Sequence, residues 1–429
     1  MFSLKKHPLI YGTVALTGAG LLCRLIGFFF RIYLSRTFGG AQMGIYQLTG
    51  PVIGITLSIT SGIFQTVISK MTAEEKSNNT RALCVGLSIA LPLSFLTTIL
   101  LYKNANFLAT FWLKEAACAP LIRIFSLCII PACVHSCLGG FFLGRKKMYL
   151  PAIAQILEQI VRTGSVVLFI RHLTSTGHTP ILSVIMIGSL FGEVCSMLFL
   201  VTTLHLQRAS LQFGHTTGLY RPFLTLASPL FGTRIVVNLL QAFETIMLPQ
   251  YLKMHTASAN EALTMYGTLT GMALPLILFP TTLTGSLATT LLPGISSLRA
   301  AGQFKKARRT FSVTTRFCFA LGLGCAIFFF ISADFLGEIV FESSLCGLFI
   351  KTLAPLCPFL YMNTTLTGTL QGLGKMNTVF FIQVLCLSLR CILLVFLLPV
   401  YGILGYLYIL LFVNILQCFL SYFSVKKNI

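Results

Sequence analysis

The sequence predicts an all-α integral membrane protein with about twelve transmembrane helices in two six-helix lobes related by a pseudo-two-fold repeat. Three observations support this prediction. Hydrophobic residues make up 55% of the 429 residues and charged residues only 10%, whereas about a quarter of a soluble domain is charged. The hydrophobic residues form blocks of about 20, the length of helix that crosses a hydrocarbon core. Two segments of the chain also repeat at a constant offset.

The blocks predict twelve spans joined by short connections. They lie at residues 9–36, 44–69, 82–102, 118–143, 150–170, 180–206, 222–250, 261–291, 312–332, 346–371, 377–398 and 402–424. The first block follows Lys5 and Lys6 but has no small-residue cleavage site, so we interpret it as a spanning helix rather than a signal peptide.

Lysine and arginine predict the orientation. Of the 31 such residues, 19 lie in one set of alternate connections, 6 in the other and 6 inside spans. Because cytoplasmic connections are enriched in Lys and Arg, we expect both termini in the cytoplasm and the protein in the plasma membrane. This asymmetry also accounts for most of the net charge of +21, so we expect no nucleic-acid partner.

An internal repeat predicts the two lobes. Seven residues of the segment 138–162 recur in 366–390 at an offset of 228, among them Gly144, Gln155 and Arg162. We therefore expect an N-terminal lobe at 1–207, a cytoplasmic linker at 208–221 and a C-terminal lobe at 222–429. Paired repeats of this kind build transporters with a substrate site between them, and a monomer is expected because one chain supplies both lobes.

Ionisable residues inside spans are the candidate site, because charge in the bilayer is costly and usually functional. The candidates for binding an anion are Arg24, Arg31, Gln155, Arg162, Arg234 and Asn238. Arginine binds phosphate bidentately and stays charged when buried. Arg31 is alternatively interfacial.

Two carboxylates are candidates for coupling to H⁺ or Na⁺. Glu158 precedes Arg162 by four residues, which favours either an ion pair that holds the helix bundle together or a part of the ligand site. Glu244 has no basic residue one turn away, so it is either a coupling residue or an interfacial one near the end of its helix.

Enzymatic and metal motifs are absent from the sequence. Asp334 is the single aspartate, and no Walker A, HExxH, GxSxG or CxxC pattern occurs. These motifs would be expected of a nucleotide hydrolase, a zinc protease, a serine hydrolase or a zinc site. We predict a protein that is not an enzyme and that binds no cofactor or metal, with its 14 cysteines mostly in apolar spans.

The first two spans carry a family resemblance. Residues 24–39 read RLIGFFFRIYLSRTFG, residues 44–48 read GIYQL, and a later connection reads GRKK at 144–147. The sequence resembles the stage V sporulation protein B and polysaccharide-flippase branch of the MOP (multidrug/oligosaccharidyl-lipid/polysaccharide) exporter superfamily. Relatives in the lipid II flippase group carry an Arg-Asp pair late in the first helix, where this chain has Phe30 and Arg31.

The resemblance implies a MATE-like fold and alternating access. It implies export of a lipid-linked saccharide or peptidoglycan precursor, for example in sporulation, with Arg24 and Arg31 contacting the pyrophosphate. Lipid II flippases often have fourteen helices, whereas drug exporters of the superfamily have twelve. A cation-coupled multidrug exporter is therefore the alternative function.

Overall fold

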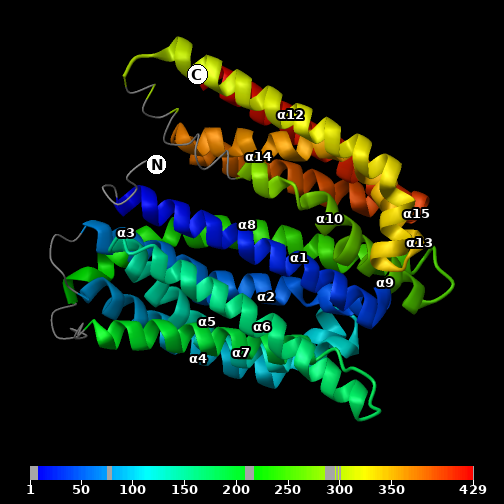
Figure 1. Ribbon diagram of the computed structural model, residues 1–429, viewed down its shortest axis with the longest axis horizontal. Coiled ribbons are helices and arrows are strands. Elements are labelled where there is room, and N and C mark those ends of the chain that lie inside the picture. The colour runs from blue at the N-terminus through cyan, green and yellow to red at the C-terminus, as the bar shows by residue number, and fades with distance from the viewer. Residues whose placement is uncertain are drawn as a thin grey trace. The chain divides into compact units, whose positions relative to one another are not determined.

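The computed structural model describes residues 8–74, 80–207, 217–285, 295, 298 and 301–428. Throughout these ranges the regular secondary structure is helical, as the sequence predicts (Figure 1). The chain forms two compact units, one of Met1–Phe30 with Leu48–Leu239 and one of Arg31–Gln47 with Leu240–Ile429. This division places residues 31–47 with the second half of the chain. Most of the predicted linker (208–216) lies outside the described residues, so the lobe boundaries stay a prediction.

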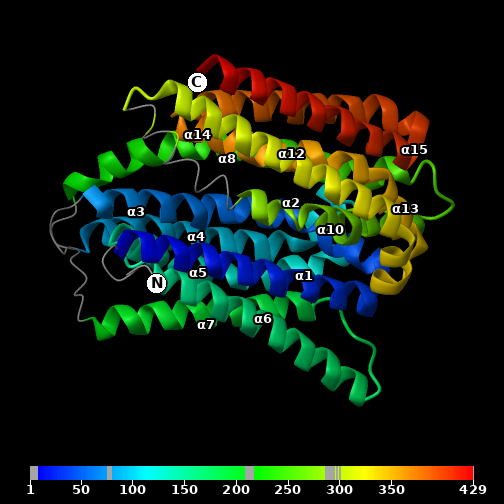
Figure 2. The same ribbon diagram turned by 45° about the horizontal axis from the view of Figure 1, so that its top comes forward.

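The first unit is a bundle of long helices. Its elements are α1 (Pro8–Leu48, of which the part up to Phe30 belongs here), α2 (Gly50–Leu57), the π-helix η2 (Ser58–Gly62), α3 (Ile63–Glu74), α4 (Arg81–Phe107), α5 (Ala119–Gly144), α6 (Tyr149–Ser175), α7 (Val184–Leu206) and α8 (Tyr220–Leu252, of which the part up to Leu239 belongs here). Helices α4, α5, α6 and α7 run side by side in both views (Figures 1 and 2). Helix α5 is central and is packed by α3, α4 and α7.

In the part of the second unit that the structure describes there are six further α-helices. They are α9 (Ala259–Gly267), α10 (Leu274–Leu278), α12 (Phe304–Phe335), α13 (Ser344–Leu353), α14 (Cys357–Gly372) and α15 (Met376–Asn428), with a π-helix at Thr268–Ala273 between α9 and α10 and another at Leu336–Val340 after α12. Helix α14 packs against both α12 and α15 (Figure 1).

Ten helical stretches in the described residues are long and apolar enough to cross a membrane. Two of them, Val14–Glu74 and Met376–Asn428, are 61 and 53 residues long, and about 20 residues suffice for one crossing. Each contains a break at a glycine with positive φ, Gly39 at 72° and Gly402 at 56°. The multi-pass architecture is confirmed, and the count of twelve spans stays a prediction.

Large apolar side chains cover the outside of the helices as well as the inside. On α12, Phe317, Phe328 and Ile331 are 54%, 58% and 77% exposed. A soluble protein does not leave so much contiguous apolar surface in water. These faces fit a surface that lipid tails cover.

The turn after α5 and the turn after α14 have the same hydrogen bonds at the offset of the sequence repeat. Lys147 N donates to Phe142 O at 2.9 Å, and Lys375 N donates to Leu370 O at 2.9 Å. The residue before each lysine has a positive φ, 61° at Lys146 and 73° at Gly374. The two turns at equivalent positions of the sequence repeat thus share their local backbone geometry.

Candidate functional site

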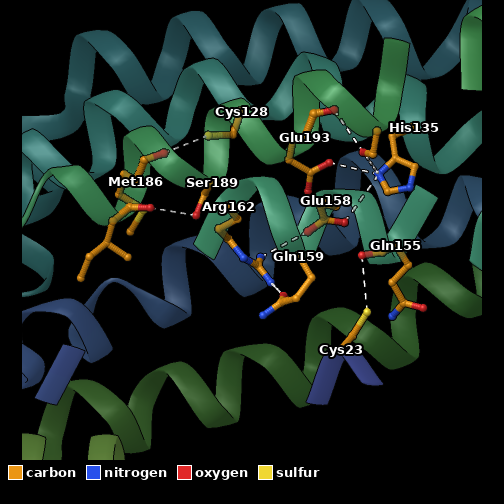
Figure 3. A network of polar contacts seen from close by, with 12 residues as sticks. Cys23, Cys128, His135, Gln155, Glu158, Gln159, Arg162, Met186, Ser189 and Glu193 are labelled. Carbon is orange, nitrogen blue, oxygen red and sulfur yellow. Dashed lines mark hydrogen bonds and ion pairs between the residues drawn. The ribbon is translucent and has the colours of Figure 1, made fainter. Parts of the chain in front are cut away.

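Four ionisable side chains meet between α5, α6 and α7 of the first unit (Figure 3). His135 Nδ1 on α5 lies 3.1 Å from Glu193 Oε2 on α7 and 4.0 Å from Glu158 Oε2 on α6. Arg162 Nη1 lies 3.2 Å from Glu158 Oε1, so the two residues form an ion pair, and whether this pair is also part of the ligand site stays a prediction. Ser196 Oγ also lies 3.1 Å from His135 Nδ1. We call His135, Glu158, Arg162 and Glu193 the charged cluster.

Two glycines on α7 bring α6 and α7 close enough for this cluster to form. A Cβ atom at Gly192 would lie 2.7 Å from the Glu158 carbonyl oxygen, and one at Gly188 would lie 2.9 Å from the Arg162 carbonyl oxygen. Real Cβ atoms do not approach backbone oxygen so closely, so only glycine fits there. Small residues four apart commonly allow such close helix packing in membranes. The next residue, Glu193, is consequently held near Glu158.

Arg162 is held on α6 by two neighbours. Besides its ion pair with Glu158, its Nη2 donates to Gln159 Oε1, and Gln159 is 5% exposed. The Arg162 side chain nevertheless keeps 32% of its surface exposed, against 16% for Glu158. The guanidinium is therefore positioned by protein groups and still reachable by a ligand.

The cluster includes a possible metal-ligand set. One ligand atom from each of His135, Glu158 and Glu193 lies within 4.8 Å of the others. However, Arg162 already neutralises Glu158, and His135 bonds to Glu193 and Ser196. A divalent cation would have to displace these contacts to bind here.

Arg24 and Arg31 both lie on α1. Arg24 is in the part of α1 that belongs to the first unit, and Arg31 is in the part that belongs to the second unit. Arg24 is exposed and Arg31 is partly buried. Neither makes an ion pair or side-chain hydrogen bond with any described residue. Their charges are therefore not neutralised by the described chain.

Arg234 and Asn238 lie one turn apart on α8 and both contact the π-helix η2. Asn238 Nδ2 donates to Ser58 Oγ at 2.7 Å, and a Cβ atom on Gly62 would lie 2.4 Å from Arg234 Nη1. Gly62 thus leaves room for the guanidinium. Single-turn π-helices inside longer helices are frequent at functional sites, and the role of Arg234 and Asn238 in binding stays a prediction.

Glu244 is not the isolated carboxylate that the sequence suggests. In the second unit its Oε2 lies 2.8 Å from Arg390 Nη2, and its Oε1 accepts a hydrogen bond from Tyr406 at 2.7 Å. Arg390 comes before the break at Gly402 and Tyr406 after it. Spacing along one helix cannot reveal these partners, since they lie more than 140 residues away. Glu244 therefore joins the two parts of α15 to α8.

Three further residues are Gln155, which the sequence analysis named as a candidate, and His135 and Glu193, which it did not. Gln155 has an exposed side chain, and its backbone carbonyl accepts a contact from Cys23 Sγ at 3.5 Å. Sequence reasoning missed His135 as a site residue, although an ionisable histidine inside a predicted span met the same criterion as the other candidates. Glu193 is an ionisable residue inside a span, and this property alone marks it as a candidate.

The chain is similar to two solved transporters over nearly its whole length. One is the lipid II flippase MurJ in an inward closed conformation, with a TM-score of 0.75 and 17% identity, covering 96% of this chain and 87% of that one. Another is an inward-facing multidrug resistance MATE family transporter of the MOP superfamily, with a TM-score of 0.73, 14% identity and 95% coverage of both chains. These likenesses confirm the predicted MATE-like fold.

Sequence comparison gives the family. Stage V sporulation protein B of Bacillus subtilis (strain 168) is 27% identical over 387 residues, covering 86% of this chain and 74% of that protein. The lipid II flippase MurJ of the same organism is 26% identical over 170 residues, covering 37% of this chain and 31% of that protein. Residues 9–299 match the family described as polysaccharide biosynthesis protein, and this chain belongs to that family.

Proposed function

We propose that this protein is a flippase that moves an anionic lipid-linked saccharide across the plasma membrane by alternating access. Peptidoglycan and polysaccharide precursors are the substrate class that its family and the names of its relatives support. The transported lipid and the surrounding membrane lipids are its partners, and it acts as a monomer with both termini in the cytoplasm. No catalytic step is required of it.

The observation that supports this function best is a set of membrane arginines without carboxylate partners. Arg24, Arg31 and Arg234 make no ion pair with a described residue, whereas Arg162 and Arg390 each pair with a glutamate. An unpaired guanidinium in a bilayer is costly unless a ligand or water meets it. A pyrophosphate supplies the charge and the bidentate acceptors that arginine prefers.

Coupling to H⁺ or Na⁺ is assigned to Glu158 within the charged cluster. Its carboxylate faces both a cation, Arg162, and a second acid–base pair, His135 with Glu193. Protonation or cation binding there would change which of these partners Glu158 holds. Glu244 is the weaker coupling candidate, because Arg390 and Tyr406 occupy both of its oxygens.

The test is flipping of a fluorescent polyprenyl-pyrophosphate saccharide in proteoliposomes. We expect the wild type to flip it and the Arg24→Ala/Arg31→Ala double variant to lose at least tenfold in rate, since each lost charge-assisted contact is worth about 1.5–3 kcal/mol. Glu158→Gln should retain binding but lose the response to an imposed H⁺ or Na⁺ gradient.

The matched control is Lys103→Ala/Arg171→Ala, which removes the same charge from two exposed positions outside the predicted spans, neither of which makes an ion pair with a described residue. Equal losses in both double variants would contradict a specific role for Arg24 and Arg31. Absence of flipping together with cation-dependent efflux of a lipophilic dye would overturn the flippase proposal in favour of drug export.

A further inference from the structure

A concave site lies wholly within the second unit, between the start of α12 and the end of α15. It is a cavity of about 310 Å³, at the lower end of the range typical of ligand pockets. Arg308 and Arg316 come from α12, and Lys426 comes from α15. We call this the α12–α15 cavity.

Among the described residues, three cations and no acidic side chain line this cavity. Arg308 and Arg316 are eight residues apart on α12, so two turns of helix put them on the same face. No ion pair or hydrogen bond joins Arg308, Arg316 or Lys426 to another described residue. Like charges gathered around one hollow repel one another, and an anion placed among them relieves that repulsion.

A buried hydroxyl at the same cavity adds a neutral donor. Thr315 is 7% exposed, lines the cavity and has an Oγ1 without a hydrogen-bond partner. Helical threonines of this chain commonly bond to the carbonyl four residues earlier, as Thr60 and Thr369 do. Thr315 does not, and an unpaired buried hydroxyl costs free energy. An acceptor in the cavity would satisfy it.

Two aromatic rings give the cavity an apolar wall. Phe311 is buried, and its ring centroid lies 6.2 Å from that of Tyr422, which also lines the cavity. A cavity that combines cations with an apolar wall suits a ligand whose anionic group is attached to an apolar chain. Basic pockets between membrane helices on the cytoplasmic side bind anionic lipid head groups in this way.

We propose that the α12–α15 cavity is a binding site for the phosphate group of an anionic lipid, held by Arg308, Arg316 and Lys426 with a hydrogen bond from Thr315. The site is distinct from the charged cluster and from Arg24, Arg31 and Arg234. It does not depend on the proposed flippase activity, because a resident phospholipid and a transported polyprenyl phosphate present the same chemical group.

The test is lipid retention by the purified full-length protein, measured by native mass spectrometry and by titration with fluorescent lipids. The probes are phosphatidylglycerol, undecaprenyl phosphate and, as an uncharged comparison, diacylglycerol. We expect the Arg308→Gln/Arg316→Gln/Lys426→Gln variant to weaken binding of a phosphate-bearing lipid at least tenfold. Thr315→Val, which keeps the shape and removes the hydroxyl, should weaken it about three- to tenfold.

The control variant is Lys305→Gln/Lys306→Gln/Arg309→Gln. It removes the same charge from exposed positions of α12 that do not line the cavity. Retention within about threefold of wild type in this control, with loss in the cavity variant, supports the site. Equal losses in both triple variants, or no effect of Thr315→Val, overturn it, because a diffuse surface field would then explain the binding.

The two lipid probes separate the source of the phosphate. Preference for phosphatidylglycerol identifies a resident membrane lipid, and preference for undecaprenyl phosphate identifies the transported class. Retention of diacylglycerol as strongly as of either phosphate lipid would overturn the proposal. Because binding is read without any flipping assay, failure of this site and failure of the proposed function are distinguishable.

Discussion

Arg162 and Arg390 occupy equivalent positions in the two repeats, and both are neutralised by a glutamate, but from different places. Arg162 pairs with Glu158 one turn earlier on the same helix, whereas Arg390 pairs with Glu244 on α8. The position four residues before Arg390 is Cys386, which cannot serve. The repeat thus has an arginine at this position in both halves, while its counter-charge comes from different helices.

The Arg162–Glu158 and Arg390–Glu244 ion pairs also differ in how exposed they are to a ligand. The Arg162 side chain is 32% exposed and its partner Glu158 also faces His135, which suits exchange with a ligand. The Arg390 and Glu244 side chains are 20% and 9% exposed, and Tyr406 occupies the remaining Glu244 oxygen. We expect the first pair to matter for transport and the second for stability.

Replacing Glu244 by Gln is therefore expected to destabilise the protein by about 3–5 kcal/mol, because it leaves Arg390 as an uncompensated buried charge. The measurement is the midpoint of unfolding in detergent. Glu338→Gln is the control, since Glu338 is exposed and has no described ion-pair partner. A Glu244→Gln variant as stable as the control would show that the Arg390 contact contributes nothing to the fold.

Helix existence was predictable from this sequence, and helix contacts were not. Long apolar blocks indicate a span wherever they occur, so the helical stretches follow from composition alone. His135 and Glu193 are 58 residues apart in the sequence, and no helical period relates residues on different helices. The pair Glu158 and Arg162 was predictable because one turn separates them. The rest of the cluster depends on which helices pack together.

The sequence also indicated the helix breaks at Gly39 and Gly402 only in part. The sequence predicts connections near both, yet helical hydrogen bonding continues up to each break, so each pair of helices forms one stretch. At Gly402, Pro399 contributes by removing a backbone donor. His255 Nε2 lies 2.8 Å from the Pro399 carbonyl, a contact that depends on the fold.

At the scale of elements, the packing of α6 on α7 should depend on Gly192. Alanine there would place its Cβ 2.7 Å from the Glu158 carbonyl oxygen, and the two helices would have to separate. We expect Gly192→Ala to cost about 1–3 kcal/mol of stability, as overpacking does. Chemical unfolding in detergent measures the loss, and weakened ion dependence of flipping would show that Glu193 had moved from Glu158.

Gly164→Ala on α6 is the matched control. Its Cβ would meet nothing within 4 Å, and alanine favours a helix over glycine by up to about 1 kcal/mol. This variant should be as stable as wild type or slightly more so. If both variants lose stability equally, close approach at Gly192 is not what holds α6 and α7 together.

At the scale of the whole molecule, the number of crossings and the side of each connection are linked. The described residues contain ten spanning stretches, two of them about twice the length of the others and broken at Gly39 and Gly402. If the chain recrosses the membrane after each break, the count becomes twelve. An even count puts both termini on one side, which the uneven distribution of Lys and Arg independently predicts to be the cytoplasm.

Alkaline phosphatase fusions test this topology, because the enzyme is active only when exported. Fusions after Gly39 and after Gly402 should be active, whereas fusions after Lys147, after Lys375 and at the C-terminus should be inactive. A fluorescent-protein fusion, which reports the cytoplasm, should give the reverse pattern at each site.

An inactive phosphatase at Gly402 together with an active one at the C-terminus would mean that the orientation inferred from Lys and Arg is inverted for the last two spans. Activity of equal strength after Gly402 and at the C-terminus would mean that α15 crosses the membrane only once. Either outcome would also place Lys426, and with it the α12–α15 cavity, at the outer face rather than at the cytoplasmic face that the Lys and Arg distribution predicts.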